Sequence, residues 1–251
     1  MLKNNWITIK NLNKKYRKFP WQIPAHILKD FSLQIYKNDR LAIIGPNGSG
    51  KTTLVEIIAG YKSKTSGNIE YSFEYKNSPY ECIAIQFQEN KFIKKYKVSR
   101  IYKELVKYAK SFINEEFTEQ LKNILNIDSL MNITYGSLSG GQKQRINLFF
   151  SLIYNPKVLI LDEFTAGLDI QTKSLVKELL LVYLNQFETS LILVSHDANE
   201  VFSLCDRIIF INNGQITGEV KDIKTKFNNQ EELEKYMLQN INTFNFKKSG
   251  N

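Results

Sequence analysis

Positions 40 to 53 of the chain read Arg40-Leu41-Ala42-Ile43-Ile44-Gly45-Pro46-Asn47-Gly48-Ser49-Gly50-Lys51-Thr52-Thr53. The apolar run at 41–44 predicts a short buried strand, and the glycines that follow predict a tight loop directly after it. Beyond the loop, Leu54, Ile57 and Ile58 fall at helical spacing, and Gly60 is a suitable helix stop. The segment therefore predicts a strand, a glycine-rich loop and a helix in immediate succession.

The loop fits the pattern G-x-x-x-x-G-K-[ST], whose chemistry is phosphate binding. Its glycines let backbone N–H groups face phosphate oxygens, and the helix that starts near Lys51 adds the positive end of its dipole. Lys51 is expected to reach the β- and γ-phosphates of a nucleotide, and the Thr52 hydroxyl to bind Mg²⁺. A glycine-rich turn can match this pattern by chance, but the strand and helix around it favour the phosphate site. The predicted nucleotide-binding positions are Gly45, Pro46, Asn47, Gly48, Ser49, Gly50, Lys51, Thr52 and Thr53.

Two adjacent carboxylates, Asp162 and Glu163, follow the apolar run at 158–161. Such a run is typical of a strand buried in a parallel sheet, and ligands of these sheets bind at the carboxyl ends of the strands. Asp162 is therefore a candidate Mg²⁺ ligand, directly or through water, and Glu163 a candidate for polarising an attacking water molecule. Two acids after a strand can also be ordinary loop residues; the upstream phosphate loop favours the catalytic interpretation.

The flanking segments predict an α/β domain with a mostly parallel sheet. Residues 6–11 and 27–35 alternate apolar and polar side chains, which is typical of half-buried strands. Residues 191–194 form a second buried run, which ends at Ser195-His196, and Asp169 can cap a helix that extends to about Leu184. Residues 208–216 predict a hairpin, because Asn213-Gly214 supplies the positive φ angles of its turn. Helices that alternate with buried strands define this fold class.

Between positions 89 and 148 the pattern is different. Apolar and aromatic residues recur every three or four positions at 101–112 and 117–125, which predicts a helical lobe. The polar segment from about residue 228 retains some helical spacing, at Leu233 and Met237. A chain of 251 residues accommodates one domain with an inserted lobe as readily as two domains.

The composition excludes several classes of protein. A hydrophobic content of 43% and a charged content of 24% are typical of a folded globular chain. No run of about 18 uncharged apolar residues occurs, so the sequence predicts no membrane span, and the first residues lack the apolar core of a secretory signal. Cys82 and Cys205 lie far apart and outside any metal-ligand spacing, which predicts reduced thiols. A net charge of +9 is compatible with binding to nucleic acid or to an anionic membrane surface. Because the lysines are scattered along the sequence, we give this charge little weight as evidence for either function.

The sequence Leu138-Ser139-Gly140-Gly141-Gln142, followed by Lys143-Gln144-Arg145, resembles the signature motif of the ABC ATPases. It stands a short helix upstream of the acid pair, as in that family. Ser139 and Gln142 also fit a capping box, so the same residues predict a helix whose glycine-fronted N-terminus binds an anion. In the family this helix faces the γ-phosphate held by the other subunit of a dimer. The resemblance therefore implies that Ser139, Gly140, Gly141 and Gln142 bind nucleotide in trans.

The resemblance covers about residues 6–220 and implies both the fold and the cofactors. The implied fold is a RecA-like P-loop NTPase core with an N-terminal antiparallel β portion and an inserted α-helical lobe. It forms a single ABC ATPase domain over residues 1–232, with the core at about 1–88 and 149–232 and the lobe at about 89–148. Residues 233–251 are then a polar C-terminal tail. The implied cofactors are ATP and Mg²⁺.

Further positions match the family residue by residue. Tyr16 resembles the aromatic residue that stacks on adenine, although a tyrosine packed at a strand end fits equally well. Gln88 resembles the glutamine that contacts Mg²⁺ and the attacking water, with Gln86 as a competitor. His196 resembles the switch histidine that contacts the γ-phosphate, and residues 166–169 resemble the loop that crosses the dimer interface. The implied catalytic residues are Glu163, His196 and Gln88, and the implied metal ligands are Thr52, Gln88 and Asp162.

Two segments depart from the family pattern. Phe164 occupies the position where the family usually has proline. The substitution leaves the acid pair intact, but the loop that follows the pair need not have the usual shape. The segment 17–25, with Pro20, Trp21 and Pro24, is longer than the usual hairpin connection.

The resemblance also implies partners and a location. It implies a transporter subunit, cytoplasmic and peripheral on the inner face of the membrane, that pairs with itself or with another ABC chain. A coupling helix of a separate transmembrane permease would dock near Gln88, and no nucleic acid partner is expected. The alternative is a non-transport ABC ATPase acting on ribosomes or nucleic acid; a single cassette without heptads or a cysteine cluster disfavours it. Substrate and direction are not readable, although residues 166–169 and 200–207 resemble export-type cassettes.

Overall fold

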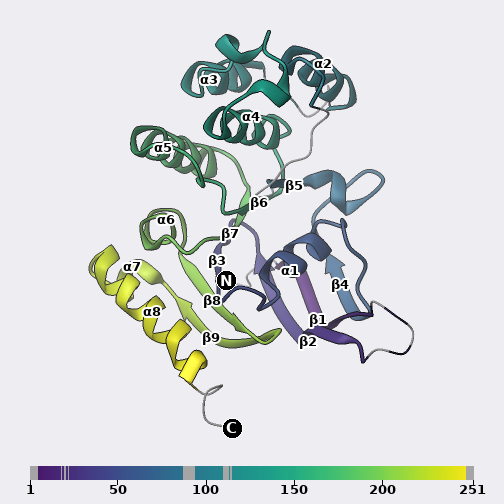
Figure 1. The fold of residues 1–251 in the computed structure, drawn as a ribbon, viewed down its shortest axis with the longest axis vertical. Helices are drawn as coiled ribbons and strands as arrows, with labels where there is room; N and C mark the ends of the chain where they lie inside the picture. Colours follow the sequence, from purple (N-terminus) through teal and green to yellow (C-terminus); the bar gives the residue numbers. More distant parts are fainter. Residues whose placement is uncertain are drawn as a thin grey trace. The chain divides into compact units, whose positions relative to one another are not determined.

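The computed structural model describes residues 5–17, 19, 21, 23–86, 94–109, 113 and 115–246. By their internal contacts these residues form two compact units. The first comprises the chain up to Glu81 together with everything from Ser190 onward, and the second is Cys82–Thr189. Each unit combines strands with helices (Figure 1), as the alternation in the sequence predicts.

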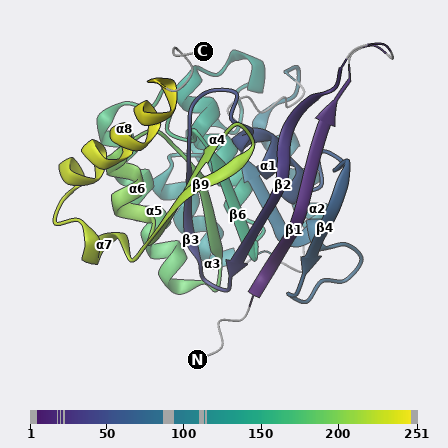
Figure 2. The ribbon, with the colours of Figure 1, turned by 90° about the horizontal axis from the view of Figure 1, so that it is seen from below.

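In the first unit, an antiparallel sheet is formed by β1 (Asn5–Tyr16), β2 (Ala25–Tyr36) and β4 (Ser66–Tyr71), in the order β2-β1-β4. β1 and β2 are longer than the alternating stretches that predict them. Figure 2 shows the three strands side by side. Ile7, Ile9 and Leu12 of β1 are almost completely buried, because one face of the sheet covers the core while the other faces water.

The same unit holds a row of four strands in the order β7-β3-β8-β9. These are β3 (Arg40–Ile44), β7 (Ser190–Val194), β8 (Arg207–Asn212) and β9 (Gln215–Lys221). β3 is parallel to β7 and β8, and β9 is antiparallel to β8. β3 and β7 are buried almost from end to end, which is why they read as continuous apolar runs. The predicted turn between β8 and β9 is confirmed, with φ of 48° at Asn213 and 78° at Gly214.

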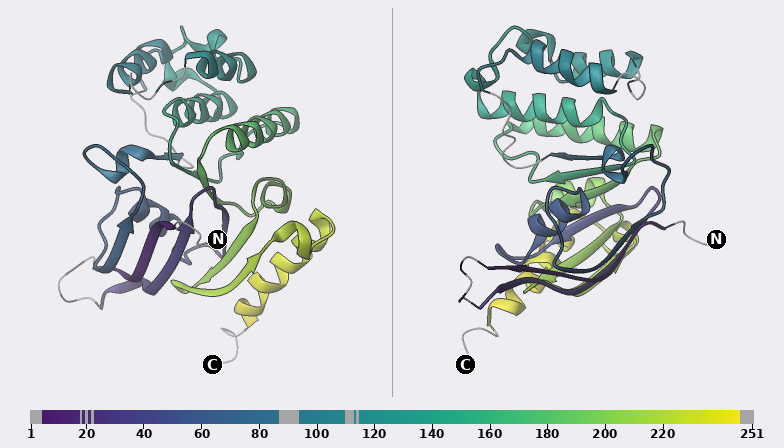
Figure 3. Two further views of the ribbon diagram at one scale, coloured as in Figure 1. Left: turned by 180° about the vertical axis from the view of Figure 1, so that it is seen from behind. Right: turned by 90° about the vertical axis from the view of Figure 1, so that its right-hand side faces the viewer.

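The described residues of the first unit also form four α-helices. α1 (Lys51–Ile58) follows the phosphate loop, and Gly60, at a φ of 77°, lies just beyond its end. α6 (Ala198–Leu204), α7 (Ile223–Lys226) and α8 (Gln230–Phe246) follow β7 and β9; in Figure 3, α8 is the long yellow helix. Leu233 and Met237 are buried, so the helical spacing in the predicted tail marks a packed helix.

The second unit contains the predicted helices of the lobe. Parallel strands β5 (Ile83–Gln86) and β6 (Val158–Asp162) accompany α2 (Val98–Ala109), α3 (Glu115–Ile124), α4 (Gly140–Leu152) and α5 (Ile170–Gln186). Short 3₁₀ turns occur at Asp128–Leu130 and Tyr135–Ser137, and a further one, Pro79–Cys82, ends at the first residue of this unit. Phe117 of α3 packs on Tyr183 and Phe187, with ring centroids 5.2 and 5.0 Å apart. The unit is wider than residues 89–148, and the domain boundaries given by the sequence stay a prediction.

The N-cap predicted for α5 is confirmed. The Asp169 carboxylate accepts hydrogen bonds from the backbone N–H and the hydroxyl of Thr172, at 2.8 and 2.7 Å. These bonds hold the pKa of the Asp169 carboxyl below its usual value, because they favour its charged form.

The described residues of the segment 17–25 form the tip of the β1–β2 hairpin. Phe19 and Trp21 stack with ring centroids 5.3 Å apart, and Trp21 and Ile23 are largely exposed. In the described part of the chain, no helix combines the length and the apolar character that crossing a bilayer requires.

Candidate functional site

The phosphate loop has the backbone that its glycines predict. Gly48 and Gly50 have φ angles of 77° and 106°, in the region that favours glycine. The Ser49 N–H donates to the Pro46 carbonyl at 3.2 Å, which closes the loop, and α1 begins directly after Gly50. The loop thus presents the N-terminus of a helix, where anions are stabilised.

Polar groups inside the loop fit a phosphate ligand. The Lys51 ammonium, which is 7% exposed, donates to the carbonyl oxygens of Gly45 and Pro46 at 2.7 and 3.0 Å. The Ser49 hydroxyl is buried and has no hydrogen-bond partner among the described residues. A buried hydroxyl without a partner costs free energy. The donor set of Lys51, Ser49 and the helix N-terminus therefore suits an anionic group.

Gly214 is a supporting residue that sequence reasoning missed. Its N–H donates to the Ser49 carbonyl at 3.1 Å, and its own carbonyl accepts from the Lys29 N–H at 3.0 Å. A Cβ on Gly214 would lie 2.0 Å from the Ile27 carbonyl oxygen. The Asn213-Gly214 pair correctly predicts the hairpin turn. It does not predict the contacts of this turn with the phosphate loop and β2, because both lie more than 150 residues earlier in the chain.

Tyr16 lies at the end of β1, where it pairs with Ala25, and is 38% exposed. The ammonium groups of Lys14 and Lys62 lie 4.7 and 5.7 Å from its ring centroid. Lys62 also forms an ion pair with Glu56 at 2.6 Å, and hydrogen bonding to that carboxylate raises the pKa of Lys62. The ring is accessible enough to stack on a base, and this role of Tyr16 stays a prediction.

His196 lies at the same sheet edge as the phosphate loop. Val194 pairs with Ile43 in parallel register, so the residues after β7 and after β3 leave the sheet at neighbouring strand ends. Ser195 holds the turn: its hydroxyl donates to Glu200 at 2.6 Å and accepts from the Asp197 N–H at 3.0 Å.

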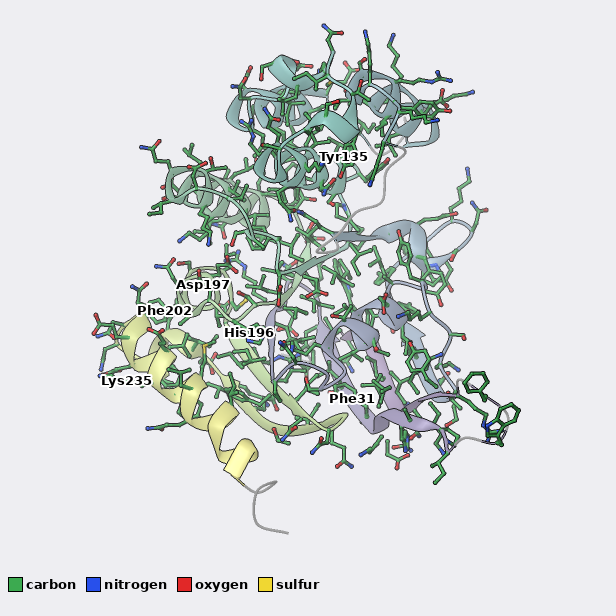
Figure 4. The ribbon with its side chains drawn as sticks, in the orientation of Figure 1. Phe31, Tyr135, His196, Asp197, Phe202 and Lys235 are labelled. Carbon is green, nitrogen blue, oxygen red and sulfur yellow. The ribbon has the colours of Figure 1, made fainter. Side chains whose placement is uncertain are left out.

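The loop of His196 is thus anchored by buried neighbours while the histidine itself is exposed. Figure 4 labels His196 and Asp197. A hollow of about 430 Å³ beside them is lined by His196, Asp197, Ala198, Asn199, Gln230 and Glu234. Sequence spacing places His196 after a strand, but it does not reveal the supporting contact between Ser195 and Glu200.

The acid pair ends β6 in the second unit. Asp162 is 5% exposed, whereas Glu163 is more accessible and has a φ of 50°. A non-glycine residue in this region stores strain, and such residues cluster at functional sites. Phe164, which replaces the usual proline, is buried, and the Ala166 N–H closes the turn onto the Glu163 carbonyl at 3.1 Å. An apolar anchor and a hydrogen-bonded turn shape this loop without proline.

The signature residues form the predicted capping box. The Gln142 N–H donates to the Ser139 hydroxyl at 3.2 Å, and the Ser139 N–H donates to Oε1 of Gln142 at 2.9 Å. Ser139 and Gly140 are exposed, and among the described residues no heavy atom outside the adjoining residues and the backbone of the helix itself lies within 4 Å of a Cβ built on Gly140. The helix N-terminus is therefore ordered by its own side chains and open to an approaching anion.

The two glutamines of the sequence interpretation have different outcomes. Gln86 is completely buried at the end of β5, and its Nε2 donates to Oε1 of Gln144 on α4 at 2.6 Å. This contact ties Gln86 to the interior of the signature helix. Gln88 lies outside the described residues, so its metal-binding and catalytic roles stay predictions.

The predicted residues thus fall into two groups. The first unit brings the phosphate loop and His196 to one sheet edge and carries Tyr16. The second unit carries Asp162, Glu163 and the signature residues. A phosphate loop on a RecA-like core, an acid pair after a buried strand and a capped signature helix together define an ABC ATPase cassette.

Comparison with known proteins agrees with this class. Residues 28–166, more than half of the chain, match the family model described as ABC transporter. The chain is 34% identical over 222 residues to the sulfate/thiosulfate import ATP-binding protein CysA of Mannheimia succiniciproducens, covering 84% of this chain and 60% of that protein. It is 31% identical over 227 residues to the spermidine/putrescine import ATP-binding protein PotA of Mycoplasma mycoides, covering 86% and 61%. The chain belongs to the ABC transporter family.

A third relative is covered more fully. The energy-coupling factor transporter ATP-binding protein EcfA of Malacoplasma penetrans is 31% identical over 238 residues, covering 89% of this chain and 83% of that protein. The chain spans only about 60% of the length of the first two relatives. Their names refer to import or to energy coupling, so they do not support the resemblance to export-type cassettes.

Solved structures share the fold. A dimeric ATP-binding cassette in a post-hydrolysis state with ADP and phosphate aligns with a TM-score of 0.74 at 23% identity, covering 86% of this chain and 98% of that one. The ATP-binding subunit of an ABC transporter aligns with a TM-score of 0.76 at 18% identity, covering 93% and 99%. These structures establish the RecA-like core of the fold class predicted from the sequence.

Proposed function

We propose that the chain binds and hydrolyses ATP and thereby drives transport through a transmembrane permease on a separate polypeptide. The observation that carries the proposal is the signature helix: its N-terminus is capped by Ser139 and Gln142, and it is open at Gly140. An exposed, preorganised anion site of this kind suits a phosphate presented by another chain. Family membership and the transport-related names of the relatives support the same function.

In this proposal the first unit holds the nucleotide. Lys51 and the N-terminus of α1 stabilise the β- and γ-phosphates, the Ser49 hydroxyl gains a partner, and Tyr16 stacks on adenine. Thr52, Asp162 and Gln88 would hold Mg²⁺, which when bound would neutralise phosphate charge. Hydroxyl, carboxylate and amide oxygens are hard ligands that suit this ion.

Hydrolysis requires a water molecule oriented towards the γ-phosphate. Glu163 is proposed to polarise that water, because it follows the buried β6 and is more accessible than Asp162. His196 is proposed to contact the γ-phosphate from the loop after β7. Gln142, Gly141, Gly140 and Ser139 of a second chain would complete the site, so that ATP links two chains until it is hydrolysed.

The dimer is tested with Glu163→Gln, which keeps the size of the side chain but removes its charge. This variant should bind ATP, fail to hydrolyse it and accumulate as a dimer in light scattering. Adding Ser139→Arg should abolish the dimer, because a long side chain at the helix start blocks the approaching phosphate. Ser129→Arg is the matched control, since Ser129 is exposed in the same unit but outside the signature helix. A dimer that survives Ser139→Arg would refute the shared site.

The permease is tested by purification from membranes at physiological salt. The chain should copurify with a membrane protein and lie peripherally on the cytoplasmic face. Recovery with ribosomes or nucleic acid would favour the alternative, a non-transport ABC ATPase. Lys51→Ala should remove ATP binding in calorimetry, because backbone N–H groups alone leave the phosphate charge under-compensated.

A further inference from the structure

The hairpin formed by β1 and β2 is basic along the part that includes its connecting segment. Residues 10–29 contain six cationic side chains and no carboxylate. The cations are Lys10, Lys14, Lys15, Arg17, Lys18 and Lys29. Asp30 is the first acidic residue of the chain, so no neighbour earlier in the sequence neutralises this charge.

The end of this hairpin extends beyond the rest of its sheet. The pairing of β1 with β4 begins at Asn13 and Ser66 and runs away from the connecting segment, whereas the pairing of β1 with β2 continues to Tyr16 and Ala25. Figure 2 shows this two-stranded ribbon projecting past β4. Its base is anchored, because the Lys14 ammonium donates to the Ser63 carbonyl at 2.6 Å.

Three apolar side chains alternate along the connecting segment and face solvent. Phe19, Trp21 and Ile23 are 42%, 80% and 95% exposed. The rings of Phe19 and Trp21 stack almost in parallel, with centroids 5.3 Å apart and an angle of 7° between their planes. Apolar side chains gathered at an exposed point indicate an interaction site, because their removal from water is favourable.

Cations flank these apolar side chains on the first strand of the hairpin. Lys15 and Arg17 are exposed, and within the described residues neither is paired with a carboxylate. The hairpin therefore changes from cationic to aromatic and aliphatic as it approaches its end. An anionic bilayer has the matching order: phosphate groups attract cations, the headgroup region accommodates tryptophan, and the acyl boundary accommodates aliphatic side chains.

We infer that the hairpin tip, defined as Phe19, Trp21 and Ile23 together with Lys15 and Arg17, binds the surface of an anionic lipid bilayer. The apolar side chains enter the interface, and the two cations contact lipid phosphates. This inference goes beyond the proposed function, because a direct contact with lipid requires neither ATP nor the permease.

Two observations favour lipid over nucleic acid as the partner of the hairpin tip. Ile23, its most exposed apolar side chain, has no ring on which a base can stack. Phe19 and Trp21 already cover one face of each other's ring, which leaves less aromatic surface for bases. A projecting tip also reaches an extended surface without needing a complementary groove.

The charge contribution is tested by cosedimentation of the full chain with phosphatidylserine vesicles. Lys15→Gln/Arg17→Gln should bind about thirtyfold more weakly, as expected for the loss of two cations near an anionic surface. The matched control, Lys221→Gln/Lys224→Gln, removes the same exposed charge near α7 and should bind like the wild type. Equal losses in the two variants would reduce the effect to net charge and overturn the inference.

The apolar contribution is tested in the same assay with Trp21→Gln/Ile23→Gln. This variant should bind about tenfold more weakly, because it removes the side chains that would enter the interface. Leu238→Gln is the control, since Leu238 is a 51% exposed apolar residue on α8, and it should bind like the wild type. Unchanged binding of the Trp21 variant would show that charge alone holds the chain on the vesicles and would overturn the inference.

Tryptophan fluorescence locates the contact. The chain has two tryptophans, Trp6, which is 7% exposed, and Trp21, which is 80% exposed. Bound vesicles should shift the emission to shorter wavelength, and brominated lipids should quench it. Trp21→Phe should abolish the shift but retain binding, because phenylalanine is also apolar. An emission spectrum that does not change when the wild type binds vesicles would overturn the inference.

Two further probes test other partners. Tighter binding of single-stranded RNA than of vesicles, lost in the Trp21 variant, would replace lipid with nucleic acid. A shift of Trp21 emission caused by ATP alone would assign the hairpin tip to the nucleotide and overturn the inference. Calorimetry separates the two proposals: ATP binding without vesicle binding refutes only this inference, whereas vesicle binding without ATP binding refutes only the proposed function.

Discussion

Replacing Asp39 by asparagine is expected to destabilise the first unit through a buried ion pair. The Arg207 Nη2 lies 2.6 Å from Oδ2 of Asp39, and the two side chains are 7% and 9% exposed. The pair joins the turn before β3 to the first residue of β8. Removing one partner of a buried pair costs about 3–5 kcal/mol, because the other charge remains desolvated and uncompensated.

The surroundings of Arg207 place the expected loss near the lower end of that range. Nη1 lies 3.4 Å from the carboxylate of Glu219, which is 39% exposed, and Nη2 also donates to the Gln34 carbonyl at 2.7 Å. These contacts retain part of the compensation. Nε, however, is already buried without a hydrogen-bond partner among the described residues. We therefore expect a loss of about 3 kcal/mol, which lowers Tm by about 6–12 °C in a chain of this size.

Urea unfolding followed by tryptophan fluorescence measures this loss, since the buried Trp6 lies in the same unit. Arg207→Met should destabilise as well. The double variant should then be less destabilised than the sum of the single variants, with a coupling energy of about 1–3 kcal/mol. A change below about 0.5 kcal/mol for Asp39→Asn, as for ordinary surface substitutions, would refute the reasoning, and so would additive effects in the double variant.

Three further outcomes are expected. Tyr135→Phe should lower the free energy of unfolding by about 1–2 kcal/mol in urea titrations, because the buried Asn147 oxygen loses its donor; an unchanged midpoint would contradict this. Cys205 should react with iodoacetamide far more slowly than Cys82, as mass spectrometry of the native protein would reveal, because Cys205 is fully buried and burial raises the pKa of its thiol; equal rates would show that the site opens readily. Gly214→Ala should weaken ATP binding in calorimetry, because its Cβ would lie 2.0 Å from a carbonyl oxygen of β2 and displace the turn that holds the phosphate loop; wild-type affinity would show that the loop does not depend on this turn.

Features encoded by near neighbours were predictable from the sequence. The phosphate loop, the turn at Asn213-Gly214 and the cap at Asp169 are each specified within a few residues, because φ preferences and capping hydrogen bonds act locally. The capping box of Ser139 and Gln142 is of the same kind. Buried parallel strands such as β3 and β6 are also predictable, since burial on both faces leaves a continuous apolar run.

Only the tertiary structure decided which distant residues meet. Gln86, a competitor for a catalytic role in the sequence, is instead buried against Gln144, and the charge of Arg207 is balanced by Asp39. Likewise, the phosphate loop is held by Gly214, far along the chain. No local pattern specifies such pairs, because side chains meet across the sheet and the lobe only once the strands and helices have packed, and the free energy of each contact depends on the burial that this packing creates.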